Sequence, residues 1–348
     1  MRYNPGMKTF INLPPKIEAA IDGILAQPEN SSWISRAQLL HEKYQKGKKH
    51  PQESYIRDFV DVAAYLGMRV PATYAQIAGA LYQVRETMPD WQPESVLDLG
   101  SGPGTAVWAA KEVWPSLKKA TAIDNDGSLL SVSRELFNKS DIELDLEWKG
   151  DSLRSDFGSK NNKYDVVILA NVLNELTEEE RIKVIDRAFT QSSKILVIIE
   201  PGTPAGAQII TSSYTNFTNK NFLLSPFINN TFVDTKDFWL HFPQRFKRPQ
   251  FQRRIRQQMR ASSLMASDWE ETKYSYITLS KYSAQVTAWG RVVSPIKKQK
   301  AWFDITVLTA KGIEKLQVFK RDKEKYNLVR KLKWGDIVES ELVNQRIS

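Results

Sequence analysis

The chain has 348 residues, a formal net charge of +9, no cysteine and three histidines. Its length exceeds one average domain, and a hydrophobic fraction of 41% is enough for a sizeable core. The composition excludes disulfides and thiolate metal sites, and three scattered histidines argue against a zinc site, so no metal is expected. The sequence contains neither a run of about 18 apolar residues nor an N-terminal signal pattern, so we expect a cytoplasmic protein without a membrane partner.

The N-terminal quarter of the chain is predicted to be helical. Apolar residues recur at helical spacing over 16–26 and 32–44, and Pro71 introduces a further helix over 71–87. We expect residues 1–90 to form an N-terminal helical cap.

Strands and helices alternate after residue 95. Strands are predicted over 95–99, 119–124, 144–148, 164–170 and 194–200, and helices over 105–113, 128–138 and 178–189. This alternation is typical of an α/β fold with a doubly wound, Rossmann-like parallel sheet. We assign residues 91–283 to this domain, including an insertion over 203–263. Residues 284–348 are predicted to form a small antiparallel β module, either an OB-like barrel or an ordinary structural appendage.

A glycine loop follows the first predicted strand. Gly100, Gly102 and Gly104 alternate with other residues between Asp98, near the end of that strand, and a helical stretch. Glycine accepts positive φ and lets the backbone approach a ligand closely. A strand before, a helix after and Asp124 at the end of the next strand provide the context of a nucleotide-type cofactor site.

Two cofactors use a loop of this kind. NAD needs Gly-x-Gly-x-x-Gly to hold a pyrophosphate at the helix N-terminus, but Thr105 occupies the position of the third glycine. S-adenosylmethionine has no phosphate; Asp98 would orient its ammonium end and Asp124 would accept both ribose hydroxyls. S-adenosylmethionine is therefore the predicted cofactor, with Ser101 also in its loop, and a glycine turn without a ligand is the alternative.

Polar residues also follow the third and fourth strands, where ligands of an open α/β sheet bind. Asp151 would accept from an adenine amino group and Asn171 would face the sulfonium. A turn role for Asp151 and helix capping by Asn171 and Asn174 are equally open. Glu200, at the end of the fifth strand, either orients a substrate or stabilises the fold.

The signatures of several methylases are absent. The fourth strand is followed by Asn-Val-Leu-Asn instead of the Asn/Asp-Pro-Pro-Tyr/Phe of amine methylases, and the carbon methylases that use a cysteine nucleophile are excluded. Methyl transfer can proceed chiefly by in-line positioning of the reactants, so few catalytic side chains are needed. We assign no catalytic residue.

Positive charge is concentrated in the last third of the chain, where residues 241–348 carry 23 Lys/Arg and 10 Asp/Glu. Such asymmetry favours a polyanionic partner. Residues 245–260 contain seven cations and no acid, interleaved with Phe246 and Phe251, which predicts an RNA-binding strip; a solvated helix face is the alternative. The strip consists of Arg245, Lys247, Arg248, Arg253, Arg254, Arg256 and Arg260. Further cations crowd the predicted turns of the C-terminal module at Lys297, Lys298, Lys300, Lys320, Arg321 and Lys323.

The chain resembles a family of methyltransferase-like small-ribosomal-subunit proteins, found in bacteria and mitochondria, whose members act in assembly of the small subunit. The resemblance lies in Arg-Val-Pro-Ala-Thr-Tyr at 69–74, the glycine loop and its helix at 96–110, Val-Leu-Asn-Glu-Leu at 172–176, Glu-Pro-Gly-Thr-Pro at 200–204, His-Phe-Pro-Gln-Arg at 241–245, Lys-Tyr-Ser-Tyr-Ile at 273–277 and Trp-Gly-Asp at 334–336. It implies a class I S-adenosylmethionine-dependent methyltransferase fold and, as partner, the small ribosomal subunit or its RNA.

One departure from the family concerns cysteines. Family members often carry cysteines in the insertion that look like iron–sulfur ligands, and Phe227 and Leu240 stand at two of those positions here. Because these side chains cannot replace thiolates, no iron–sulfur cluster is expected, and apolar packing is expected to hold the insertion.

Three functions are left open. The first is a methyltransferase acting on small-subunit ribosomal RNA. The second is an assembly factor with little or no turnover that keeps the cofactor fold as an RNA-binding scaffold. The third, a small-molecule or protein methylase, leaves the basic last third unused.

Overall fold

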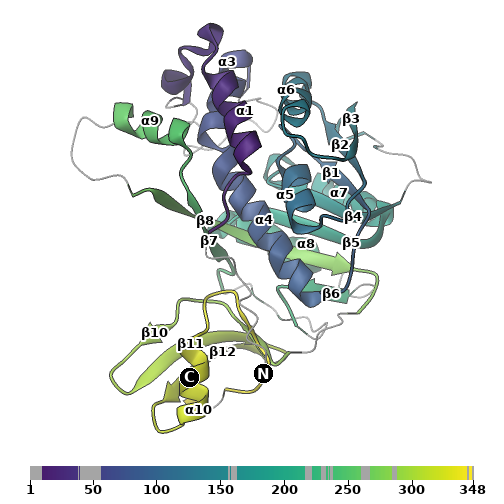
Figure 1. Ribbon diagram of the computed structural model, residues 1–348. Helices are drawn as coiled ribbons and strands as arrows, with labels where there is room; N and C mark the ends of the chain where they lie inside the picture. The colour runs from purple at the N-terminus through teal and green to yellow at the C-terminus, as the bar shows by residue number, and fades with distance from the viewer. Residues whose placement is uncertain are drawn as a thin grey trace.

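The computed structural model describes residues 10–37, 39, 56–155, 157, 163–215, 222–228, 233, 235, 238–259, 267–283, 288–342 and 345–346. Two β-sheets organise this part of the chain, a large one in the body of the molecule and a small one after residue 288 (Figure 1). None of the described helices is long and apolar enough to cross a lipid bilayer.

The large sheet has the order β3-β2-β1-β4-β5-β8-β6, and β7 also pairs with β8. Strands β1 to β5 are parallel, and β8 runs antiparallel to β5. The order reverses between β1 and β4, which creates the switch point beside which ligands of such sheets bind. These strands are β1 (Ser95–Leu99), β2 (Lys119–Asp124), β3 (Asp145–Gly150), β4 (Tyr164–Ala170), β5 (Ser192–Pro201), β6 (Phe222–Ser225), β7 (Phe242–Lys247) and β8 (Trp269–Ser280). The predicted doubly wound, methyltransferase-type sheet is confirmed.

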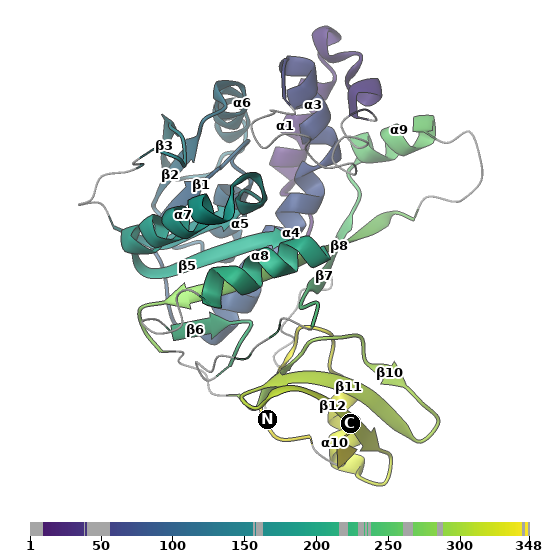
Figure 2. The same ribbon diagram turned by 180° about the vertical axis from the view of Figure 1, so that it is seen from behind.

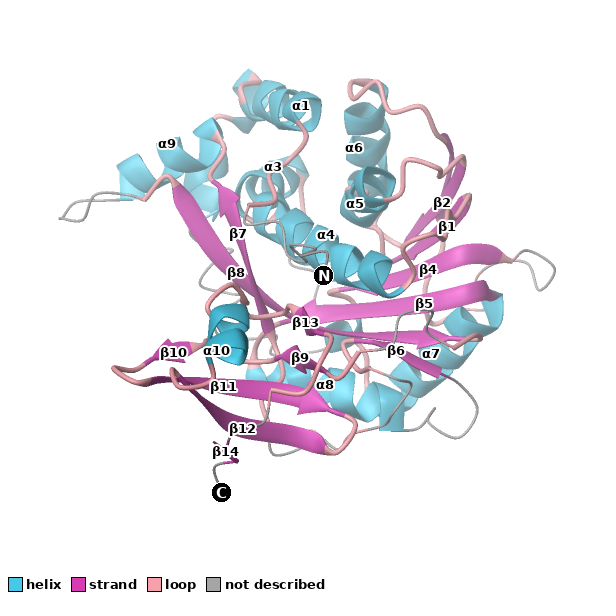
Figure 3. Ribbon diagram, turned by 60° about the horizontal axis from the view of Figure 1, so that its bottom comes forward, coloured by secondary structure: helices cyan, strands magenta, loops and turns pink. Residues whose placement is uncertain are grey.

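Helices cover both faces of the large sheet (Figures 2 and 3). On one face lie α4 (Val70–Thr87), α5 (Thr105–Val113) and α6 (Gly127–Asn138), and on the other lie α7 (Glu178–Gln191) and α8 (Pro204–Thr215). Because both faces are covered, β4 and β5 are almost continuously apolar and buried. Helix α7 begins where the sequence predicts, with a capping box between Thr177 and Glu180.

The N-terminal helices share the core of the large sheet. They are α1 (Pro15–Leu25), the short 3₁₀ turn η1 (Pro28–Asn30) and α3 (Phe59–Met68). The apolar stripe of α1 is fully buried at Ile17, Ile21 and Ile24, in the same hydrophobic cluster as the strands of the sheet. The predicted helical character is found in the described part, whereas the boundaries at 90 and 283 stay predictions.

The insertion contains elements that the sequence analysis did not assign. Besides α8, β6 and β7, the structure has α9 (Gln250–Met259), and β8 follows the insertion. The sequence analysis did not predict β8, because the buried polar residues Ser275, Thr278 and Ser280 interrupt its apolar pattern. The Ser275 hydroxyl is satisfied by the Leu240 carbonyl at 2.7 Å, which lets this strand lie inside the sheet.

The C-terminal module is a separate antiparallel sheet of order β13-β9-β11-β12-β14, with β10 paired to β11. Helix α10 covers one face, where Tyr326 and Val329 pack on Phe303 and Ile305. The elements are β9 (Gly290–Val292), β10 (Lys297–Lys298), β11 (Trp302–Thr309), β12 (Gly312–Phe319), α10 (Lys323–Val329), β13 (Ile337–Val338) and β14 (Gln345–Arg346). The small antiparallel module is confirmed, and its OB-like closure stays a prediction.

A buried arginine joins the two sheets. Arg291 of β9 is completely buried and donates from Nε to the Pro226 carbonyl at 3.0 Å. Its Nη1 donates to the Gly335 carbonyl at 2.8 Å and to Oε1 of Gln83 at 3.0 Å. Gln83 also donates to the Tyr274 hydroxyl of β8 at 2.6 Å, so this network fixes the module to α4 and the large sheet.

Candidate cofactor site

The glycine loop connects β1 to α5 in left-handed conformations. Gly100, Gly102 and Gly104 have φ of 73°, 52° and 88°, values that strain any other residue. A Cβ on Gly100 would lie 2.6 Å from Cγ2 of Val172, so packing also requires glycine there. A Cβ on Gly102 would meet only Cδ1 of Leu129, at 3.9 Å. Gly102 therefore faces space that the protein leaves open, as close approach of a ligand requires.

Asp124, at the end of β2, ties the loop to the sheet. Its Oδ2 accepts from the Gly102 N–H at 2.7 Å and its Oδ1 from the Asp126 N–H at 2.9 Å. Burial raises the pKa of this carboxyl, and the two backbone hydrogen bonds oppose that rise. Each oxygen keeps a further lone pair, so the carboxylate is positioned to accept ribose hydroxyls as well.

Asp98 is the most unusual side chain of the site. It lies near the end of β1, is 1% exposed, and its Oδ2 accepts no hydrogen bond within the described part of the chain. Burial, aided by the charge of Asp124, raises the pKa of Asp98 to about 8. A buried carboxyl without a partner is costly, and a neighbouring cation would favour its ionised form. Asp98 is thus suited to the ammonium group of a methionine moiety.

Ser101 lies between the first two glycines and ties the loop to β2. Its N–H, like that of Gly100, donates to the Ile123 carbonyl of β2. The Ser101 hydroxyl is buried and has no partner among the described residues. Within the described residues, the loop region thus contains two buried polar atoms without partners, the Ser101 hydroxyl and Oδ2 of Asp98.

Asn171 follows β4 with φ of 56°, in the left-handed region. Its Nδ2 donates to Oε1 of Gln76 on α4 at 3.3 Å, while its Oδ1 is buried without a partner in the described residues. The short 3₁₀ turn η2 (Leu173–Glu175) starts after Val172, which supplies no capping side chain. The alternative of helix capping is therefore wrong for Asn171, and a polar contact with a bound molecule stays a prediction.

Glu200 holds the turn after β4 in place. Its fully buried carboxyl accepts from the Leu173 N–H and from Nδ2 of Asn174, both at 2.9 Å. Burial raises the pKa of Glu200 to about 7, and these hydrogen bonds oppose the rise. Of the two roles that the sequence leaves open, the structure shows the stabilising one, and Asn174 serves Glu200 instead of capping a helix.

Asp151 is engaged in its own turn. Its carboxylate accepts from the Ser152 N–H at 2.7 Å and from the Ser155 hydroxyl at 2.5 Å, and its N–H donates to the Asp124 carbonyl at 3.1 Å. This is the turn role that the sequence analysis left open. A contact of Asp151 with adenine stays a prediction.

Sequence reasoning predicted the N-terminal helices but not their contacts with this edge of the sheet. Burial raises the pKa of Tyr65 on α3, with smaller effects from the charges of Arg69, Glu175 and Asp124. Gln76 of α4 reaches Asn171, and its Nε2 also donates to the Lys273 carbonyl at 2.9 Å. The Arg69–Tyr74 segment supported the family resemblance without revealing this placement.

Folding brings acidic residues to the arginine strip. Four of its members form ion pairs with the start of β8, the turn before it, and α1. The pairs are Arg245–Glu271 at 3.1 Å, Arg248–Glu270 at 3.0 Å, Arg253–Asp268 at 3.8 Å and Arg254–Asp22. Much of the charge that residues 245–260 show in the sequence is therefore compensated in the structure.

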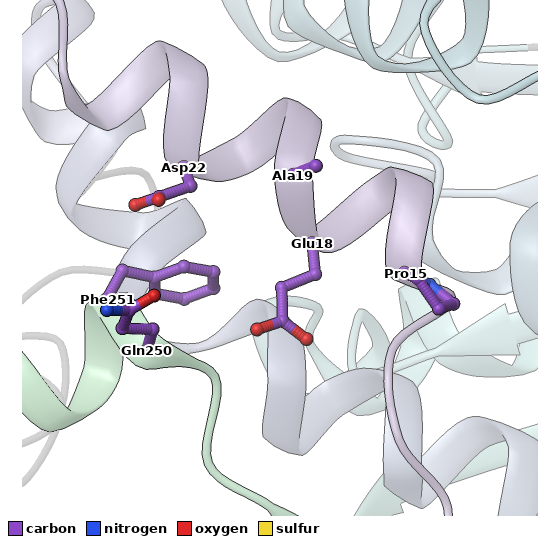
Figure 4. A pocket seen from close by; sticks show the side chains of 6 residues that line it. All are labelled: Pro15, Glu18, Ala19, Asp22, Gln250 and Phe251. Atoms are coloured by element: carbon purple, nitrogen blue, oxygen red, sulfur yellow. The ribbon is translucent and has the colours of Figure 1, made fainter.

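The strip residues also differ in their exposure to solvent. Arg248 is also buried, whereas Lys247 is exposed; the side chain of Arg256 and all of Arg260 lie outside the described residues. Beside the strip, a hollow of ≈ 390 Å³ separates α1 from α9, and Glu18 and Asp22 point into it (Figure 4). The hollow lies away from the glycine loop and shares no residue with it. RNA binding by the strip stays a prediction.

The two positions where the family carries cysteines are apolar and buried. Phe227 is 1% exposed and packs edge-on against Tyr214, with ring centroids 5.2 Å apart, and Leu240 is 7% exposed. Apolar packing thus holds both positions, while the absence of an iron–sulfur cluster stays a prediction. The described residues contain no cluster of three or more histidine or carboxylate side chains suited to a metal.

Comparison with known proteins identifies the family. A family model described as mitochondrial small ribosomal subunit Rsm22 matches residues 59–339. The human mitochondrial ribosome assembly protein METTL17 is 23% identical over 316 residues, which cover 87% of this chain and 67% of METTL17.

Solved methyltransferase structures are also similar. An O-methyltransferase family protein from Burkholderia thailandensis is 18% identical, with a TM-score of 0.40, over 51% of this chain and 58% of that chain. The plantazolicin methyltransferase in complex with S-adenosylhomocysteine is 12% identical, with a TM-score of 0.36, over 76% of this chain and 95% of that chain.

These findings correct one expectation and confirm another. The expected cytoplasmic location is wrong, because the family description and the name of the human relative both say mitochondrial. The resemblance to methyltransferase-like proteins of the small ribosomal subunit is confirmed, since the family model spans most of the chain. The protein belongs to the Rsm22 family of small ribosomal subunit proteins.

Proposed function

We propose that this protein is a methyltransferase-like factor of small-ribosomal-subunit assembly that binds S-adenosylmethionine at the glycine loop. The observation that carries the cofactor assignment is the pairing of Asp98, buried with an unpartnered oxygen, with Gly102, which faces open space. The first suits the cationic methionine end of the cofactor and the second permits close backbone approach. Family membership supports the ribosomal role.

The residues at and around the glycine loop have distinct roles in this proposal. Asp98 holds the methionine ammonium, and Asp124 holds the loop while accepting the ribose hydroxyls. Asn171, whose Oδ1 is free of partners in the described part of the chain, lies at the methyl-transfer side. Ser101 adds a hydroxyl to the loop and Asp151 lies at the adenine end.

When bound, S-adenosylmethionine supplies an electrophilic methyl group. The chain then contributes chiefly by orienting a ribosomal RNA nucleophile in line with it, a contribution that alone accelerates such reactions greatly. Glu200 keeps the Leu173–Glu175 turn in shape through its two hydrogen bonds and is a positioning residue. We assign the RNA of the small subunit as the substrate.

A specific observation favours a second candidate, an assembly factor with little or no turnover. Glu200, the buried carboxyl at the end of β5, is occupied by the turn, and His241 packs between the rings of Trp239 and Trp334. Two of the described side chains that could act as a general base are thus engaged in hydrogen bonds or packing contacts of their own.

Transfer of tritium from labelled S-adenosylmethionine to small-subunit particles tests the proposal, followed by mapping of the labelled nucleotide. We expect label in one RNA nucleotide and none with the Asp98→Ala variant. Particles that remain unlabelled, although the protein binds both them and the cofactor, would select the assembly factor without turnover. Failure to bind the particles would contradict both candidates.

A further inference from the structure

The sheet of the C-terminal module has one face that its own helix does not cover. In an antiparallel pair, directly opposite residues share a face, so the register assigns side chains to the two sides. Phe303 pairs with Val318 and Ile305 with Leu316, and these four buried residues form the face under α10. The opposite side, which we name the outer face, presents Lys297, Trp302, Asp304, Lys315, Gln317 and Phe319.

In the part of the chain that the structure describes, the body of the molecule covers one end of this side of the sheet. Toward the end of β11, Leu308 belongs to the main hydrophobic core. Arg291, which lies opposite Leu308 on β9, is buried where the module meets the large sheet. At the other end, Trp302 and Phe319 are half-buried and Lys297 is exposed, while Lys315 is exposed in the middle of β12. The end with Trp302 and Phe319 lies far from the large sheet (Figure 1). A ligand therefore has access to the outer face.

Two exposed cations of this region are Lys315 on the outer face and Arg321, two residues after the end of β12. Within the described residues, neither of them has a carboxylate within ion-pair distance, in contrast to Arg245 of the strip. The one acid of this face is Asp304, and it is engaged by Gln299, Gln317 and Trp302 at 2.9 to 3.1 Å, with Lys297 nearby. The net charge available to a ligand is positive.

Two aromatic rings lie among these cations. Trp302 and Phe319 occupy opposite positions on β11 and β12, with ring centroids 5.8 Å apart and planes tilted by 47°. The Arg321 guanidinium lies over the Phe319 ring, 5.1 Å from its centroid. Trp302 is anchored by its indole N–H, which donates to Asp304 at 2.9 Å. Fixed rings beside free cations offer a surface on which unpaired bases stack while the phosphates meet the cations.

We infer that the outer face of the C-terminal sheet binds a single-stranded segment of RNA. The inference rests on the proposed role in small-subunit assembly for the source of the RNA. Single-stranded segments fit this face because their bases are free to stack, whereas duplex RNA hides its bases and is recognised through backbone and shape. The cations account for affinity, and Trp302 and Phe319 account for the preference for unpaired bases.

The test measures binding of the full chain to a fluorescent 12-nucleotide single-stranded RNA of mixed sequence, over a range of salt concentrations. The double variant Lys315→Gln/Arg321→Gln should lower the slope of log affinity against log salt by about 1.4, because each lost phosphate contact removes about 0.7 for single strands. The matched control Lys119→Gln/Lys183→Gln removes two exposed charges from the body and should leave the slope unchanged.

The aromatic part of the inference has its own variants. Trp302→Ala should weaken binding about 10-fold, and Trp302→Phe, which keeps a ring, should retain most of the affinity. A duplex of the same sequence should bind more weakly than the single strand and respond little to Trp302→Ala. Thermal denaturation of each variant confirms that the module is folded.

Several outcomes would overturn the inference. The inference fails if Lys315→Gln/Arg321→Gln and Trp302→Ala both bind the RNA with the affinity and the salt dependence of the wild type. Variants that bind the RNA normally but no longer join small-subunit particles would show that this face contacts a ribosomal protein instead. A wild-type chain that does not join the particles at all would contradict the proposed function, whereas unchanged variants of a chain that does join them contradict only the outer face.

Discussion

The carboxyl edge of the large sheet and the outer face of the small sheet differ in the class of ligand that each one suits, for physical reasons. At the carboxyl edge, Asp98 is buried and left-handed glycines bring the backbone close to open space, which suits a small cationic molecule. On the outer face, Lys315 is exposed, and the exposed Arg321 lies over one of two neighbouring rings, which suits an extended polyanion. Burial and the sign of the unpaired charge thus distinguish the proposed cofactor site from the proposed RNA surface within one chain.

The largest effect is expected where the two regions are joined. Arg291→Met leaves the carbonyls of Pro226 and Gly335 without their buried donor and removes the cation that lies 4.0 Å from Glu86 of α4, so the free energy of unfolding should fall by about 3–5 kcal/mol. Chemical denaturation measures this loss. Arg321→Met, at an exposed arginine of the same module, is the control and should change stability little. Equal stability of the two variants would show that the hydrogen-bond network around Arg291 does not stabilise the contact between the module and the large sheet.

Gly102→Ala separates cofactor binding from folding. Its φ of 52° makes alanine cost about 1 kcal/mol of stability, but the added methyl meets only Leu129, at 3.9 Å. Because that methyl occupies the space open to the cofactor, affinity for S-adenosylhomocysteine should fall about 100-fold, as measured by calorimetry, while RNA binding is unchanged. Gly312→Ala, at φ of 125° with no neighbour within 4 Å, is the matched control. A parallel loss of affinity in both variants would indicate general strain.

The buried carboxyls should make the ligand-free protein less stable at alkaline pH. Burial raises the pKa of Asp98 to about 8 and the pKa values of Glu200 and Glu86 to about 7, well above ordinary carboxyl values. Between about pH 4 and pH 8 the folded chain therefore holds protons that the unfolded chain has released, so stability falls as pH rises. Melting temperatures should be lower at pH 8 than at pH 5, and Asp98→Asn should reduce this difference. Identical pH profiles of variant and wild type would exclude Asp98 as a source.

The smallest effect is expected in the arginine strip. Arg253 and Arg254 already pair with Asp268 and Asp22, so Arg253→Gln/Arg254→Gln should lower the salt slope of RNA binding by less than the about 1.4 expected for the outer face. The same titrations with the 12-nucleotide RNA measure both. A larger drop for the strip variant would reverse the assignment and make the strip the main RNA surface.

The sequence predicts the cofactor edge better than the RNA surface. The bounds of β1, β2 and β4 match the predicted ranges because each is a short apolar run between turn residues, and the glycine loop lies where its spacing indicated. Ion pairs of the strip join residues distant in sequence, such as Arg254 and Asp22, so no local pattern reveals them. The long strand β8 escaped prediction because its buried polar residues interrupt the apolar pattern, and Ser275 bonds to the Leu240 carbonyl, which only folding brings near.

The most direct test of the account is calorimetric titration of the purified chain with S-adenosylhomocysteine. The glycine loop, Asp98 and Asp124 predict one site with micromolar affinity, about −8 kcal/mol, that the Gly102→Ala variant largely loses. A folded chain that takes up no S-adenosylhomocysteine at millimolar concentration would contradict the cofactor site.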